Sequence, residues 1–136
     1  MFKEETVSTM EPETKPANLL VEENLADKYI AHLKQVIVKK KLYLHPEFTI
    51  QDMSNVSGIP LHHISNSLNT RLQKNFSEFI NEFRIEHAKL ILQESTSTKF
   101  TMEQIARTCG FGSKTSFNNA FKKHTGITPS EFRKQK

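Results

Sequence analysis

Two clusters of polar side chains in this 136-residue chain have the chemistry needed to read the edges of DNA bases. Asparagine can pair bidentately with adenine, serine and threonine reach either base type, and lysine suits the O6 and N7 atoms of guanine. On an exposed helix face the same side chains are often only solvated, so their type alone leaves both interpretations open. The candidates are His62, Ser65 and Asn66 in one cluster and Lys114, Thr115, Ser116 and Asn119 in the other.

Basic side chains near both clusters are candidates for contact with DNA phosphates. Such contacts set affinity and salt dependence but not sequence preference. Lys122 and Lys123 could instead form a plain charged helix face, and Arg84 could make a structural hydrogen bond. The five candidates are Arg71, Lys74, Arg84, Lys122 and Lys123.

The elements that would position these residues occur twice along the chain. The segment from Thr49 to Ile59 matches the segment from Thr101 to Phe111, and the copies end on Ser-Glu-Phe at residues 77–79 and 130–132. Core patterning alone would not repeat the polar turn and cap residues as well. The repeat predicts two helix-turn-helix units, and two such units on one rigid body can touch two stretches of one duplex.

The charge is distributed unevenly along the chain. Residues 1–24 carry two lysines against six glutamates, a net charge of −4, whereas residues 25–48 carry five lysines against two acids, a net charge of +3. Residues 49–136 carry twelve Lys and Arg against seven acids, a net charge of +5. A basic folded part behind an acidic leading tail favours contact with phosphate.

Other classes of site find little support in the sequence. Cys109 is the only cysteine, and the spacing of His62, His63 and His87 to it fits no standard zinc pattern. Cys109 occupies an apolar position, which indicates a small buried hydrophobe. There is no phosphate-binding glycine loop, and no nucleophile stands beside a base and an orienting acid. The sequence therefore predicts no metal, no cofactor and no enzyme, and the lack of a long apolar run or signal peptide predicts a cytoplasmic protein.

Helical periodicity and caps predict an all-α fold of about seven helices. Capping boxes are expected at Thr49 with Asp52, Thr101 with Gln104, and Thr128 with Glu131, and Ser113 is expected to cap a further helix. The predicted core includes Phe76, Phe79, Phe83, Phe111, Phe117, Phe121 and Phe132, which follow helical spacing.

These patterns divide the chain into five predicted segments. They are a disordered acidic tail (1–23), a lead-in helix (24–44), a first helix-turn-helix unit (45–74), a linker helix (75–94), and a second unit with a short C-terminal helix (99–134). The lead-in helix has an apolar stripe of Leu25, Tyr29, Leu33, Val36 and Ile37. That stripe is expected to pack onto the first unit, and use of helix 25–40 as a dimer contact is the alternative.

Residues 45–134 resemble the DNA-binding domain of AraC-type transcriptional regulators. The resemblance rests on Ile105-Ala106, Cys109-Gly110-Phe111, Ser116-Phe117, Phe121-Lys122-Lys123, Gly126 and the run Thr128 to Arg133, together with the linker segment 81–92. It implies two homeodomain-like helix-turn-helix subdomains joined by one linker helix, with both recognition helices on one side of the molecule. It also implies promoter binding, with contact to RNA polymerase, as the output domain of a larger bacterial regulator.

Three positions depart from the pattern of that family. Gln73 stands where a glycine is usual, so the end of that helix is expected to be capped differently. Ser54 replaces a small apolar residue, and Asn119 stands where an arginine is common. Because the first recognition helix also has no Arg or Lys before Arg71, the first unit is expected to bind DNA more weakly than the second.

The sequence thus predicts a sequence-specific regulator whose partner is double-stranded DNA. The alternative is a helix-turn-helix scaffold that acts mainly as a protein-interaction module. No small-molecule ligand is expected within this chain, because a short tail and one helix cannot enclose an effector. Regulation would then come from an upstream portion, which could also dimerise, from the amount of protein, or from a partner.

Overall fold

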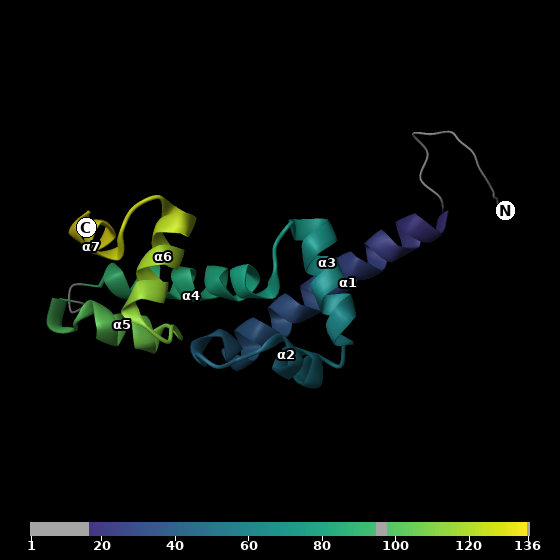
Figure 1. Cartoon of the computed structure of the whole chain (residues 1–136), viewed down its shortest axis with the longest axis horizontal. Coiled ribbons are helices and arrows are strands. Elements are labelled where there is room, and N and C mark those ends of the chain that lie inside the picture. The colour runs from purple at the N-terminus through teal and green to yellow at the C-terminus, as the bar shows by residue number, and fades with distance from the viewer. Residues whose placement is uncertain (1–16, 95–97, 136) are drawn as a thin grey trace.

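The computed structural model describes residues 17–94 and 98–135, and the side chains of residues 17–22 are outside this description. Within these ranges the chain forms seven α-helices, a 3-10 turn and no strand, which confirms the all-α prediction (Figure 1). The elements are α1 (Ala17–Lys40), η2 (Leu42–Leu44), α2 (Ile50–Ser57), α3 (Leu61–Leu72), α4 (Phe76–Leu92), α5 (Met102–Thr108), α6 (Lys114–Thr125) and α7 (Pro129–Lys134).

Side-chain caps set the start of most of these helices. The three predicted capping boxes are confirmed before α2, α5 and α7, where each cap hydroxyl accepts from the third helical N–H and the third side chain accepts from the cap N–H. Ser113 caps α6 as predicted. A further box that the sequence analysis missed joins Asn75 to Glu78 before α4.

Two hydrophobic cores lie along α4, which crosses the middle of the molecule in Figure 1. The first core joins α1, α2 and α3 to the N-terminal half of α4, where Phe79 and Ile80 are buried. The second joins α5, α6 and α7 to the C-terminal half, through Ile85, Ala88 and Leu92. Because one unbroken helix belongs to both cores, the two units are held at a fixed separation.

The predicted aromatic core is confirmed in both halves. Phe79, Phe111, Phe117 and Phe121 are buried, and Phe76, Phe83 and Phe132 are partly buried against the same clusters.

Helix α1 differs from its prediction in two respects. It begins at Ala17 rather than near Asn24, so the predicted disordered tail is too long by the part that follows Pro16. The run after that proline contains good helix formers and neither Gly nor Pro, which allows the helix to extend. Residues 1–16, the rest of the predicted tail, lie outside the described residues.

The buried stripe of α1 is also rotated from the predicted one. Ala26, Ile30, Leu33 and Ile37 are buried, whereas Leu25 is 42% exposed. Helix α1 packs against α3 and α2, so its expected docking onto the first unit is confirmed. The four residues recur every three or four positions, which is the spacing of one helix face.

Candidate nucleic-acid interface

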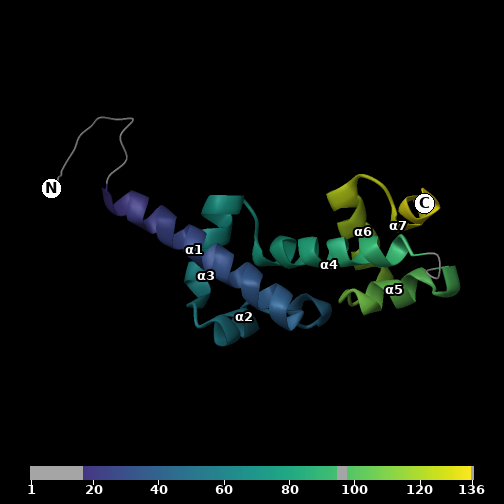
Figure 2. The ribbon, with the colours of Figure 1, turned by 180° about the vertical axis from the view of Figure 1, so that it is seen from behind.

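The two helices that carry the base-contact candidates lie on one face of the molecule. In Figure 1, α3 lies in front of α1 and α6 lies in front of α4. Figure 2, which shows the molecule from behind, reverses both relations. Helices α3 and α6 are therefore exposed on the same side, one near each end of α4.

In the first unit, the base-contact candidates lie on the outer side of α3. His62, Ser65 and Asn66 are exposed, while Ile64 and Leu68 of the same helix are fully buried. The helix begins without a side-chain cap, because Pro60 occupies the N-cap position.

In the second unit, the base-contact candidates occupy the first two turns of α6. Lys114, Thr115, Ser116 and Asn119 are all exposed, above the buried Phe117 and Phe121. The Ser113 hydroxyl accepts from the Ser116 backbone N–H at 3.1 Å and lies 3.0 Å from the Ser116 hydroxyl. The Ser116 side chain therefore already has a partner within the chain.

Arg71, a predicted phosphate contact, lies at the C-terminal end of α3 and pairs with α1. Its Nε atom donates to Oδ1 of Asp27 at 2.8 Å, and a terminal nitrogen donates to Oδ2 at 3.3 Å. This two-pronged contact with Asp27 raises the pKa of the guanidinium. The pair ties the two helices together at the far end of α3 from His62.

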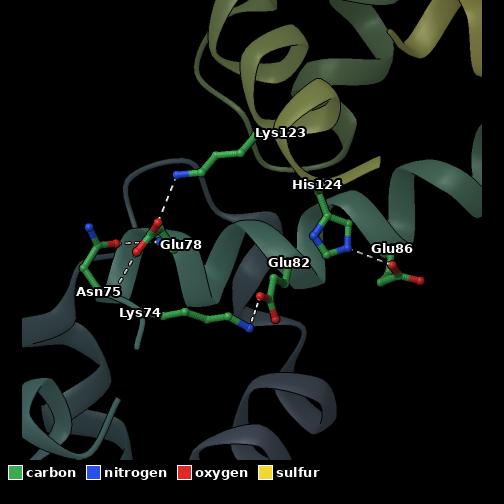
Figure 3. Close-up of polar contacts among 7 residues, drawn as sticks. All are labelled: Lys74, Asn75, Glu78, Glu82, Glu86, Lys123 and His124. Carbon is green, nitrogen blue, oxygen red and sulfur yellow. Dashed lines mark hydrogen bonds and ion pairs between the residues drawn. The ribbon is translucent and has the colours of Figure 1, made fainter. Parts of the chain in front are cut away.

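Two more of the predicted phosphate contacts pair with carboxylates along α4 (Figure 3). Lys123 of α6 donates to Glu78 at 3.0 Å, and Lys74 forms an ion pair with Glu82. One turn further on, His124 lies 3.2 Å from Glu86. Glu78, Glu82 and Glu86 recur every four residues, which places them along one side of the helix. We call these three residues the linker carboxylates.

Two of the linker carboxylates, Glu78 and Glu86, have pKa values below the ordinary value for glutamate. The backbone N–H of Asn75 and the ammonium of Lys123 lower the pKa of Glu78. Hydrogen bonds from Lys89 and His124 lower the pKa of Glu86, against the opposing effect of desolvation. A phosphate that approaches Lys123 must therefore compete with a carboxylate. Lys122, the neighbouring candidate, is exposed.

Arg84, another predicted phosphate contact, donates hydrogen bonds inside the molecule. Its Nε atom donates to the carbonyl oxygen of Tyr43 at 2.7 Å, a terminal nitrogen donates to that of His45 at 2.9 Å, and the other donates to Asn81 at 3.3 Å. The side chain is buried and its guanidinium lies 5.7 Å from the ring centroid of Phe111. Each of its three nitrogens donates a hydrogen bond inside the molecule, which favours the structural role that was the alternative for Arg84 over the predicted phosphate contact.

Gly110 lies beside Arg84, where the turn after α5 meets the segment after α1. We call this contact the junction between the units. The φ of Gly110, +96°, lies in the left-handed region, and a Cβ atom there would be 2.2 Å from the carbonyl oxygen of Tyr43. Only glycine allows the turn after α5 to approach the segment after α1 so closely. The first and second units therefore touch through backbone at this point as well as through α4.

Gln73 meets the expectation of a different cap in part. The ends of α3 and α6 share a left-handed backbone conformation, but their hydrogen bonds differ. Gln73 adopts φ 55° and ψ 41°, and Gly126 likewise adopts a left-handed conformation after α6. The side-chain amide of Gln73 donates to the carbonyl oxygen of Thr70 at 3.1 Å. A non-glycine residue in this conformation is strained by about 1–2 kcal/mol.

The remaining chemical candidates offer no reactive group. Cys109 is fully buried, and burial raises the pKa of its thiol to about 12, so it is a small hydrophobe as predicted. Among the residues that the structure describes, no three His, Cys, Asp or Glu side chains gather as a metal site requires. None of the described helices has the length and apolar character needed to cross a membrane.

Sequence reasoning missed the partners of the basic residues. Asp27, Glu78 and Glu82 neutralise three of the predicted phosphate contacts, across up to 45 positions of sequence. The four-residue spacing of the linker carboxylates was a visible signal of an acidic helix face. Nothing in the spacing indicated which cations would meet it.

Comparison with known proteins agrees with this geometry. The model of the family described as "Helix-turn-helix domain" matches residues 53–135. An uncharacterised HTH-type transcriptional regulator of Staphylococcus aureus (strain MSSA476) is 36% identical over 101 residues, which cover 74% of this chain and 13% of the relative. The chain thus corresponds to a small part of that relative. YijO of Escherichia coli K12, also named as an HTH-type regulator, is 24% identical over 85% of this chain and 34% of its own length.

Solved structures show the same fold. The C-terminal domain of the two-component response regulator yesN from Fusobacterium nucleatum superposes with a TM-score of 0.61 at 25% identity, over 74% of this chain and 93% of that one. An AraC-type regulator from Chromobacterium violaceum gives a TM-score of 0.66 at 22% identity, over 80% of this chain and 92% of that one. Together with the family match, these findings show that the chain belongs to the AraC-type helix-turn-helix transcriptional regulators, whose domain of this kind binds double-stranded DNA.

Proposed function

We propose that this chain recognises a specific DNA sequence by inserting α3 and α6 into two successive major grooves on one face of the duplex. The observation that carries the proposal is the exposure of both helices on the same side of the molecule, one at each end of the shared α4. Successive major grooves on one face of B-DNA lie about 34 Å apart. A rigid pair of units either fits straight DNA or bends it, at a cost of roughly 1–6 kcal/mol.

The exposed side chains of the two helices support direct reading of bases. His62, Ser65 and Asn66 in α3, and Lys114, Thr115 and Asn119 in α6, can form hydrogen bonds with base edges. Ser116 joins this set only if its hydroxyl leaves Ser113. Arg71, Lys74, Lys122 and Lys123 would contact phosphates, and three of them must then leave carboxylates.

The chain also fits the role of an output domain within a larger bacterial regulator. It corresponds to 13% of the length of the Staphylococcus aureus relative and to most of the solved C-terminal domain from Fusobacterium nucleatum. The signal, the oligomeric state and contact with RNA polymerase would then depend on other parts of such a protein, and these remain predictions.

The decisive experiment is selection of bound duplexes from a random DNA pool at two salt concentrations. The wild-type chain should enrich a motif with two half-sites whose centres lie about one helical turn apart. The double variant Lys114→Ala, Asn119→Ala should lose preference in one half-site and keep it in the other. Glu103→Gln, an exposed change on α5, is the matched control and should leave both half-sites unchanged.

The opposite result would point to the protein-interaction alternative. Retention of DNA that is weak, salt-sensitive and without an enriched motif would show that α3 and α6 do not read sequence. Loss of preference across both half-sites in the double variant would show that the two units do not act on separate grooves.

A further inference from the structure

Three rings connect α1 to the exposed face of α3. The centroid of the Tyr29 ring lies 5.8 Å from that of His63, with the planes tilted by 58°. The centroid of the His63 ring lies 4.4 Å from that of His62, in an edge-to-face arrangement at 79°. Both separations are close to or within the range in which aromatic pairs attract each other. The rings therefore form a continuous path from α1 to a base-contact candidate.

The inner end of this path is fixed by the fold. Tyr29 is half-buried, and its neighbours Ala26 and Ile30 on α1 are buried against the first unit. The ion pair between Asp27 and Arg71 holds the same turn of α1 onto α3. The position of the Tyr29 ring is thus set by packing and by an inter-helix contact.

The outer end of the path is exposed. His62 lies on the solvent side of α3, and within the described residues its ring contact is with His63. A cleft of about 300 Å³ between α1 and α3 is lined by Tyr29, His62, His63 and Asn66, among others. His62 lines this cleft from the exposed side of α3, in contact with the His63 ring.

An ordered side chain binds with less loss of rotamer freedom than a mobile one. A base contact by His62 therefore benefits from any neighbour that already holds its ring in place. The second unit has no such arrangement among its described residues, because its ring contacts join core phenylalanines. Support from α1 is specific to the first unit.

We propose that Tyr29 is a positioning residue, which fixes the ring of His62 through His63 and so sharpens base discrimination by the first unit. This inference rests on the proposed function, in which His62 contacts a base. Tyr29 itself touches no base in this arrangement, so its effect must pass through the two histidines.

The test compares base preference at each position of the selected motif for Tyr29→Ala, Tyr29→Phe, His62→Ala and the double variant Tyr29→Ala, His62→Ala. Tyr29→Ala should reduce discrimination by about three- to ten-fold, and only at the position that His62→Ala affects. Tyr29→Phe keeps the ring and should behave as wild type. The double variant should discriminate no worse at that position than His62→Ala, because both changes act on the same base contact, that of His62.

Leu25→Ala is the matched control, since Leu25 lines the same cleft without a ring. It should leave the preference unchanged. If Tyr29→Ala does not fold at the assay temperature, His63→Leu removes the middle ring, fills its space with an apolar side chain and carries the same prediction.

Three outcomes overturn the inference while leaving recognition of two grooves intact. The first is a Tyr29→Ala profile identical to that of wild type, and the second is a uniform loss at all positions. The third is a His62→Ala profile equal to that of wild type. The proposed function is tested separately: it fails if no motif is enriched, or if the double variant of Lys114 and Asn119 leaves the preference unchanged or removes it from both half-sites.

Discussion

The first and second helix-turn-helix units have the same order of helices but are held together in different ways. In the second unit, residues next to α6 cap both ends of this helix: Ser113 at its start and Gly126 at its end. The first unit depends on its surroundings: α3 begins after Pro60 without a side-chain cap and ends on a strained Gln73. Helix α1 compensates by covering α3 with a buried stripe and an ion pair.

The same contrast extends to charge. Lys114 stands exposed at the start of α6, whereas α3 has no Lys or Arg before Arg71, which pairs with Asp27. The fold therefore presents two very different sets of exposed side chains, on α3 and on α6. We infer that the second unit supplies more affinity and that the first depends more on positioning.

The largest expected effect is at the junction between the units. In Gly110→Ala, the added Cβ would overlap the Tyr43 carbonyl oxygen at 2.2 Å and would occupy a left-handed conformation. We expect the free energy of unfolding to fall by about 3–5 kcal/mol, from overpacking and backbone strain together. Urea denaturation followed by circular dichroism measures the change.

Gly126→Ala is the matched control for this junction. Gly126 has a φ of +89°, but a Cβ added to it would meet no heavy atom within 4 Å. The variant should therefore lose only the conformational part, about 1–2 kcal/mol. Equal losses in the two variants would mean that the approach of Gly110 to Tyr43 is not tight in solution.

Arg84→Met should lower the free energy of unfolding by about 2–4 kcal/mol. The change leaves the carbonyl oxygens of Tyr43 and His45 without their donors in a partly buried site. The slope of log affinity for DNA against log salt concentration should stay unchanged for the folded fraction. A slope reduced by about one unit with normal stability would instead assign Arg84 to phosphate.

The next largest effect is expected on DNA affinity, from the exposed side chains in which α6 differs from α3. Lys114→Ala should weaken binding to the selected site by about 1–3 kcal/mol if the ammonium contacts a guanine. Asn66→Ala in the first unit should cost less than Lys114→Ala, because its contact is neutral. Fluorescence anisotropy with labelled duplex measures both variants. A larger loss for Asn66→Ala would reverse the ranking of the two units.

The linker carboxylates should oppose DNA binding. Glu78→Gln with Glu82→Gln frees Lys123 and Lys74, so affinity should rise by about two- to ten-fold and the salt slope should steepen. The gain is small because exposed ion pairs are weak. Glu103→Gln with Glu131→Gln removes the same charge elsewhere, and an equal gain there would mean that only net charge matters.

Local signals in the sequence were sufficient for most of the fold. The capping boxes at Thr49, Thr101 and Thr128 marked helix starts to the residue, because a cap is formed by side chains only three positions apart. The buried phenylalanines followed from periodicity. Exposure of the base-contact candidates followed from the same periodicity, since a residue opposite the core faces water.

Contacts between distant segments were beyond the reach of such signals. The donors of Arg84 meet carbonyl oxygens 39 and 41 positions away, and backbone carbonyls leave no trace in the sequence. The pairing of Lys123 with Glu78 depends on how α6 docks on α4. The rotated stripe of α1 likewise depends on which of the apolar residues of α1 pack into the first core.

The smallest effect concerns how the two recognition helices end. Gln73→Gly should relieve about 1–2 kcal/mol of left-handed strain. It gives up the hydrogen bond to Thr70, worth about 0.5–1 kcal/mol on a surface, and frees the unfolded chain by about 0.4–1 kcal/mol. The balance lies within about 1 kcal/mol of zero, so the urea midpoint should change little.

The reciprocal change, Gly126→Gln, decides whether this balance is local or belongs to the unit as a whole. A glutamine after α6 would bear the same left-handed strain, and we expect a loss of about 0.5–1.5 kcal/mol in the free energy of unfolding. A swap of both residues should then cost about as much as Gly126→Gln alone. If Gln73→Gly clearly destabilised the chain, the hydrogen bond to Thr70 and the freedom gained by the unfolded chain would together outweigh the strain, and the first unit would be adapted to glutamine at this position.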